Sequence, residues 1–69
     1  MKYIVAINCE ELKGFNTVGA AQLYAANYTS AHKVTTKVLK DYGDLQELVG
    51  YYYYSTEYKR VYYVDLPNI

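Results

Sequence analysis

The chain is poor in the residues that usually carry catalysis, metal binding or covalent cross-links. Its 69 residues include one cysteine, one histidine, one proline and no tryptophan. A single cysteine, Cys9, excludes a disulfide within the chain, and its position after an apolar run predicts a small buried hydrophobe. Proteins without disulfides are typical of a reducing cytosol, so we expect a cytoplasmic protein, located in the host cell if its origin is viral.

No catalytic or metal-binding pattern is present either. One thiol and one imidazole fall short of the three or four converging ligands of a zinc site, and no acid is placed to orient His32 as a base. The four glycines stand apart, so there is no glycine-rich phosphate loop. Asp41, Asp44 and Glu47 lie near one another, but helix capping and solvation explain them more simply than a carboxylate site. We expect a protein that is not an enzyme and has no metal and no cofactor.

The charge balance and hydropathy disfavour two further classes of function. Basic and acidic residues number seven each, and the isoelectric point is near 6.5. A protein that binds nucleic acid mainly through phosphates usually carries a clear positive excess. The apolar runs are too short to cross a bilayer, and the first residues do not resemble a signal peptide, so no membrane association is expected.

The N-terminal part of the chain predicts a strand, a loop and a helix. Hydrophobic residues make up 52% of the chain, which is enough for the core of one small domain over residues 1–69. Lys2–Asn8 is β-rich and predicts a strand with neighbours on both sides. Glu10–Asn16 is charged and predicts a loop. Thr17–Asn27 is rich in alanine and predicts a helix, which either Asn16 or Thr17 can cap.

Two further helical segments are predicted in the middle of the chain. Thr29 or Ser30 can cap a helix that runs to Tyr42, and Gly43 follows it in the position of a left-handed helix cap. The next segment, from Asp44 to Gly50, opens with the pattern of a capping box and predicts one or two helical turns. The longer helix would present an apolar stripe that consists of Ala31, Val34, Val38, Leu39 and Tyr42.

The C-terminal part predicts a hairpin. Tyr51–Thr56 and Arg60–Leu66 read as antiparallel strands joined by a turn near Glu57–Lys59, and Pro67 ends the second strand. The N-terminal strand is expected to join them, because two strands alone are marginally stable. The predicted fold is therefore α+β: a three-stranded antiparallel sheet, in the chain order strand, helix, helix, short helix, strand, strand, with the helices packed on one face.

Tyrosine is the most specific feature of the chain. Seven of its eleven tyrosines lie between Tyr51 and Tyr63. A tyrosine ring buries apolar area, while its hydroxyl still needs a polar partner, so it suits both a core and a wet contact. Helices cannot cover both faces of so small a sheet, and several rings should be exposed. Alternation along the strands predicts one face with Tyr51, Tyr53, Val61 and Tyr63, and the other with Tyr52, Tyr54, Tyr62 and Val64.

The leading interpretation is a protein-binding module. Tyrosine and arginine are enriched at interface hot spots, although these tyrosines would also serve simply to fill and shield the sheet. Small size and the absence of linkers and catalytic residues are typical of accessory or inhibitor proteins of phages and mobile elements, which act by covering a surface of a larger protein. The identity of the partner stays open, and a homodimer is a further option. The predicted partner-binding residues are Tyr51, Tyr53, Tyr58, Arg60 and Tyr63.

The alternative interpretation is nucleic-acid binding. Residues Thr17 to Thr36 fit a helix-turn-helix frame, and the hairpin with Lys59 and Arg60 at its tip resembles the wing of winged-helix DNA-binding proteins. This resemblance implies a DNA-binding regulator whose 30–42 helix enters the major groove. Stacking of single-stranded bases on the tyrosines would instead need basic residues among the rings. The predicted nucleic-acid-binding residues are His32, Lys33, Thr36, Lys37, Lys40 and Lys59.

Overall fold

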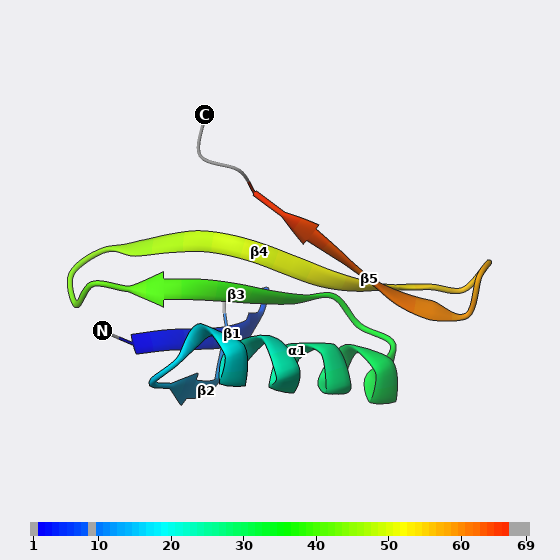
Figure 1. Ribbon diagram of the computed structural model, residues 1–69, viewed down its shortest axis with the longest axis horizontal. Helices are drawn as coiled ribbons and strands as arrows, with labels where there is room; N and C mark the ends of the chain where they lie inside the picture. The colour runs from blue at the N-terminus through cyan, green and yellow to red at the C-terminus, as the bar shows by residue number, and fades with distance from the viewer. Residues whose placement is uncertain (1, 9, 67–69) are drawn as a thin grey trace.

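A five-stranded antiparallel sheet with one helix across one of its faces forms the described part of the chain, residues 2–8 and 10–66 of a computed structural model (Figure 1). The strands follow one another across the sheet in the order β2-β1-β3-β4-β5, so that β2 and β5 are its edges. In chain order the elements are β1 (Lys2–Ile7), β2 (Glu10–Phe15), α1 (Val18–His32), β3 (Thr36–Asp41), β4 (Gln46–Ser55) and β5 (Arg60–Asp65).

The predicted three-stranded sheet with several helices is wrong. Residues 36–41, predicted as helix, form β3, and residues 46–50, also predicted as helix, open β4. The predicted loop at Glu10–Asn16 is the edge strand β2. The predicted N-terminal strand and C-terminal hairpin are present. The predictions for Cys9 and Pro67 lie outside the described residues.

Lys33 marks the point where the chain changes from helix to strand. The hydroxyl of Thr17 accepts a hydrogen bond from the Ala20 N–H and caps the start of α1, as its residue type predicts. The helix then continues five residues beyond its predicted end at Asn27, to His32. Lys33 has a left-handed backbone (φ 58°) and donates its N–H to the Thr29 carbonyl. The chain reverses there, and the β-branched residues that follow favour a strand.

The core lies between α1 and the sheet face that the helix covers. Val5 and Val38 are cross-strand neighbours on β1 and β3, and both are fully buried against Ala21 and Ala25 of the helix. Alanine has a short side chain, so the helix axis can lie close to the sheet. This close packing buries the middle of β1 and the first half of β3, apart from the exposed Lys37.

A buried polar contact joins the C-terminal part of α1 to β3. Thr29 and Thr36 are fully buried, and their hydroxyl oxygens lie 2.8 Å apart. The Thr36 hydroxyl also lies 3.2 Å from the carbonyl oxygen of Ala25, to which it donates. Both hydroxyls are therefore satisfied, which avoids the penalty for an unpaired buried polar group.

No described helix covers the opposite face of the sheet, here called the open face. Ile4 and Ala6 point to this face because they alternate with Val5, yet each is only 3% exposed. The side-chain amide of Gln46 on β4 donates to the Glu11 carboxylate on β2 (3.2 Å), across both intervening strands. The sheet is therefore coiled strongly enough that its own corners cover Ile4 and Ala6.

Gly50 is required because a side chain at this position of β4 would collide with β5. It is buried, and a Cβ atom added there would lie 2.7 Å from the Val64 carbonyl oxygen and 2.9 Å from a ring carbon of Tyr63. Gly43, predicted as a helix cap, does have a positive φ of 102°, but it serves the turn between β3 and β4. Glycine adopts this conformation without strain.

Replacement of two glycines by alanine should have opposite effects on stability. Gly50→Ala should lower the free energy of unfolding by about 1–3 kcal/mol, because the backbone of β5 must move. Gly19→Ala should raise it by about 0.5–1 kcal/mol, because Gly19 lies in the helix with nothing within 4 Å of an added Cβ. Urea denaturation measures both values. Stabilisation by Gly50→Ala would contradict the close approach of β5.

Candidate functional site

The register of the β4–β5 hairpin decides which tyrosines share a face. Ser55 pairs with Arg60, and the loop between them has four residues, 56–59. The predicted three-residue turn at Glu57–Lys59 would have paired Tyr53 with Tyr63. The additional loop residue shifts the register by one, so that Tyr53 pairs with Tyr62. A shift of one residue moves each β5 side chain to the other face, and the predicted assignment of the β5 side chains to faces is therefore wrong.

The open face of the hairpin carries a row of packed aromatic rings. The rings of Tyr53 and Tyr62 are stacked with centroids 5.7 Å apart, and Tyr51 lies 6.4 Å from Tyr53. Tyr58 in the loop meets Tyr62 edge to face at 6.3 Å, and the guanidinium carbon of Arg60 lies 5.7 Å from the centre of the Tyr62 ring. These five residues, Tyr51, Tyr53, Tyr58, Arg60 and Tyr62, are here called the tyrosine ribbon.

Solvent reaches this tyrosine ribbon. Tyr53 is 37% exposed and Tyr58 is 64% exposed, and Leu48 extends the apolar surface along β4. Lys37 is exposed on the same face, directly across from Tyr51. Since the hairpin also extends beyond the end of α1 (Figure 1), part of it stands clear of the helix. The arrangement is an aromatic surface with positive charge at its margin.

Four of the five predicted partner-binding residues lie together in the tyrosine ribbon. The fifth, Tyr63, lies on the helix-covered face, where its hydroxyl is 3.5 Å from the side-chain amide of Gln22. Tyr62, which the prediction omitted, occupies the place assigned to Tyr63. Only the correct length of the hairpin loop would have placed Tyr62 on this face from the sequence.

The structure separates the residues predicted to bind nucleic acid. The recognition helix that the winged-helix arrangement requires at 30–42 is absent, because α1 ends at His32 and β3 begins at Thr36. Thr36 is fully buried, and Lys33 places its ammonium group 4.5 Å from the centre of the Tyr54 ring. These residues are His32 at the end of α1, Lys33 at its cap, Thr36, Lys37 and Lys40 in β3, and Lys59 in the hairpin loop.

A second aromatic row runs along α1 and was not predicted. Tyr24 lies 5.3 Å from Phe15 of β2 and 6.0 Å from Tyr28, and Tyr28 lies 4.2 Å from His32, all between ring centres. The ammonium group of Lys13 is 5.5 Å from the Phe15 ring. The spacing of four residues along the helix was its signal in the sequence. Through the contact between Phe15 and Tyr24, this row packs the edge strand β2 against the helix.

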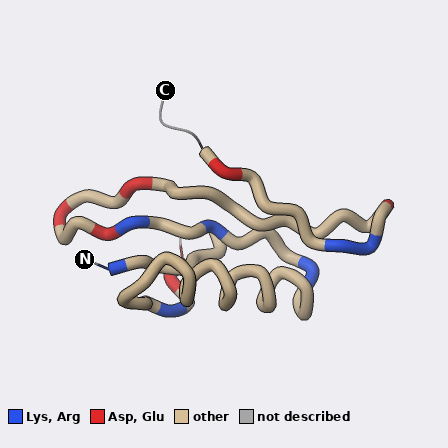
Figure 2. The backbone as a smooth tube through the Cα atoms, viewed as in Figure 1, with Lys and Arg blue, Asp and Glu red and all other residues tan. Residues whose placement is uncertain are grey.

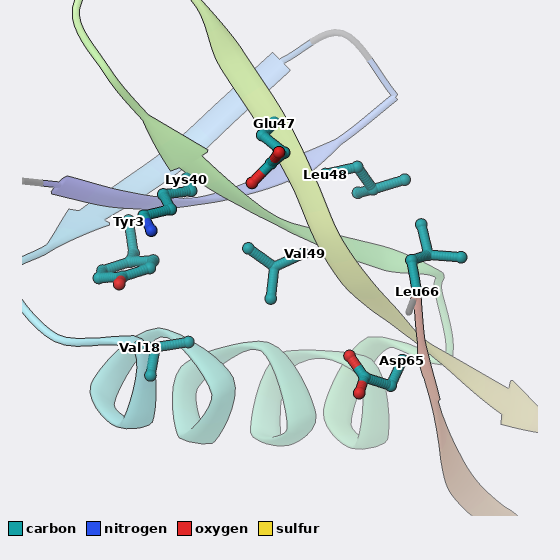
Figure 3. A pocket seen from close by; sticks show the side chains of 8 residues that line it. All are labelled: Tyr3, Val18, Lys40, Glu47, Leu48, Val49, Asp65 and Leu66. Atoms are coloured by element: carbon teal, nitrogen blue, oxygen red, sulfur yellow. The ribbon is translucent and has the colours of Figure 1, made fainter. Parts of the chain in front are cut away.

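A pocket of about 310 Å³ lies on the helix-covered side, near the first turn of α1 (Figure 3). Its volume is at the lower end of the range for ligand sites, which is about 300–1,000 Å³. Its carboxylates already accept hydrogen bonds, Glu47 from Tyr42 and Asp65 from Tyr63. Both are exposed, so they offer a ligand little beyond what water gives. The lining residues are Tyr3, Val18, Lys40, Glu47, Leu48, Val49, Asp65 and Leu66.

No protein-family model matches the chain, and no curated protein or solved structure is detectably similar to it. Within residues 2–8 and 10–66, no cluster of three or more His, Cys, Asp or Glu side chains is placed to hold a metal ion. In that part of the chain, no helix has both the length and the apolar character that a membrane crossing needs. The chemistry of the candidate site is therefore inferred from its own residues, of which the tyrosine ribbon is the most distinctive group.

Burial shifts the pKa of two tyrosines on the helix-covered face. The rings of Tyr52 and Tyr63 lie 4.6 Å apart. Burial raises the pKa of Tyr52 above its ordinary value of 10.0, and the neighbouring Tyr63 adds to the shift. Burial also raises the pKa of Tyr63, although the hydrogen bond with Gln22 opposes the shift. The folded state therefore holds both protons more tightly than the unfolded chain does.

These two raised pKa values predict a loss of stability at alkaline pH. Their contribution is complete below about pH 10, the unfolded value, and falls as the pH rises through the folded-state values. The free energy of unfolding should therefore decline above about pH 10, and less steeply in Tyr52→Phe, which has one such group fewer. Denaturation curves at a series of pH values measure both slopes, each referred to the same variant at neutral pH. An unchanged slope in Tyr52→Phe would contradict the assignment.

Proposed function

We propose that the chain is a small, non-enzymatic protein-binding module that docks its tyrosine ribbon onto the surface of a partner protein. The observation that carries the proposal is a row of stacked, partly exposed rings beside an arginine, on a sheet face that no described helix covers. Tyrosine and arginine are the residue types that most often dominate binding energy at protein interfaces.

Pre-organisation makes this surface suitable for tight contact. Tyr53 and Tyr62 already form a stacked pair, and Arg60 lies over the ring of Tyr62. Side chains fixed before binding lose little rotational freedom when the partner arrives, so more of the contact energy remains as affinity. The two strands that carry these rings are paired in regular register from Gly50–Asp65 to Ser55–Arg60, which holds the rings in place.

The mechanism is coverage of a partner's surface and involves no chemical step. An accessory or inhibitor protein acts in this way when the covered surface is a functional one. The single cysteine suits a reducing compartment, which we propose is the cytoplasm. Lys37 and Arg60 at the margin of the tyrosine ribbon favour a partner with negative charge around an apolar centre.

Removal of two rings should abolish partner binding while the fold is kept. The variant with Tyr53→Ala and Tyr62→Ala should lose its partner in an affinity pull-down from the native host, with each change weakening binding by about tenfold or more. Tyr42→Ala is the matched control, because Tyr42 is 45% exposed but lies after β3, outside the tyrosine ribbon. Circular dichroism verifies the fold of each variant.

Two outcomes of the pull-down would contradict the proposal. One is retention of every partner by the double variant. The other is loss of the captured material on nuclease treatment, because single-stranded nucleic acid also binds to aromatic surfaces with basic margins. In that case the ribbon would be a nucleic-acid surface.

A further inference from the structure

The two edges of the sheet differ in how they are protected against pairing with another strand. The outer strand β2 carries charges at Glu10, Glu11 and Lys13, and its pairing with β1 is interrupted by a bulge. Charges and bulges are devices that keep an edge strand from pairing with another chain. In β5 the pairing with β4 is regular throughout, and only the terminal residues Arg60 and Asp65 are charged. The β5 edge therefore lacks the protection that β2 has.

The hydrogen bonds between β4 and β5 show which main-chain groups of β5 point outward, away from the sheet. The Leu66 N–H donates to the Val49 carbonyl, so the N–H of Leu66 points toward β4. Directions alternate along a strand, so the N–H groups of Val61 and Tyr63 point away from β4, past the edge of the sheet. An added strand would form hydrogen bonds with these two residues.

Charge selects the direction of an added copy of the same strand. Arg60 lies at the start of β5 and Asp65 at its end, with uncharged residues between them (Figure 2). An antiparallel pair of β5 strands places the basic start of each beside the acidic end of the other. A parallel pair would place like charges together.

We propose that two copies of the chain pair through their β5 edges, antiparallel about a two-fold axis at Tyr62, to form one continuous sheet. In this register Val61 of each copy exchanges hydrogen bonds with Tyr63 of the other. Tyr62 then lies directly opposite its own counterpart on the open face, so the tyrosine ribbons of the two copies join. A two-fold axis perpendicular to the sheet keeps both helices on the same side, where they do not block the open face.

The dimer depends on the main-chain groups at the β5 edge, whereas the partner-binding proposal depends on the exposed rings of the open face, and Tyr62 is the residue that lies next to both. A monomeric chain would end the dimer proposal and leave the partner-binding proposal intact. Retention of the partner by the ribbon variants would end the partner-binding proposal, and the experiments below decide the dimer separately. The joined ribbons would present a surface twice as long to a partner.

Val61→Pro is the variant that separates edge pairing from folding. Because the Val61 N–H points outward, proline there removes no hydrogen bond between β4 and β5, while its ring obstructs the edge. Sedimentation equilibrium of the full wild-type chain should approach twice its 8.0 kDa mass as concentration rises. Val61→Pro should weaken the association by about tenfold or more, because each copy loses a donor at the interface. Val61→Thr, which keeps the N–H and the β-branched shape, is the matched control and should still dimerise.

Amide hydrogen exchange provides a second measurement that does not depend on a variant folding. The Val61 and Tyr63 amides should exchange fast in dilute solution and become protected at the concentrations where the dimer forms. The neighbouring Tyr62 amide, which is bonded to β4, should be protected at both. A wild-type monomer at every concentration would overturn the proposal, as would a dimer in which Val61 and Tyr63 stay unprotected or in which Val61→Pro associates as well as Val61→Thr.

Discussion

One helix cannot cover both faces of a five-stranded sheet, and the rest of the structure follows from this limit. The 15 residues of α1 extend roughly 22 Å, whereas the ten residues of β4 extend roughly 33 Å. The helix therefore buries the centre of one face, over Val5 and Val38, and leaves the end of the β4–β5 hairpin beyond its reach. On the other face the coiled sheet covers Ile4 and Ala6 itself. The tyrosines farther along the hairpin have no such cover.

The composition of the two faces matches this division. The helix-covered face uses small and β-branched residues where α1 lies close, and larger rings such as Tyr52 toward its margin. The open face uses stacked tyrosines, whose rings shield one another while their hydroxyls remain compatible with water. Tyrosine is one of the few large residues that suit such a half-covered surface. The richness of the hairpin in tyrosine is therefore explained by packing as well as by the proposed binding.

The local signals of the sequence were sufficient for the first strand, the start of α1 and the final hairpin, and insufficient or misleading for β2, β3 and the start of β4. The first strand, a helix cap at Asn16 or Thr17 and the final hairpin could be predicted because composition and position agree there. Residues 34–42 have apolar side chains at both helical and strand spacing, and β3 lies in the middle of the sheet, so neither spacing alone decides. The β-branched Val34, Thr35, Thr36 and Val38 were the better guide. The charged β2 gave no strand signal because protected edge strands carry charges instead of an apolar alternation.

The candidate site could be predicted only in part for a related reason. Alternation within β4 correctly separated Tyr51 and Tyr53 from Tyr52 and Tyr54, since it requires no knowledge of the partner strand. The face on which each β5 side chain lies depends on the length of the loop between β4 and β5. An error of one residue in that length moves every β5 side chain to the opposite face. Long-range contacts such as that between Gln46 and Glu11 have no local signal at all. The covering of Ile4 was therefore beyond the reach of the sequence.

The rings of Tyr53 and Tyr62 stack on the open face, on the side of the sheet opposite to α1. Nuclear Overhauser contacts between assigned tyrosine ring protons test it most directly. We expect contacts between Tyr53 and Tyr62, and separate contacts that link Tyr63 to Tyr52 and Gln22. Contacts between Tyr53 and Tyr63, or between Tyr53 and the alanines of α1, would contradict it.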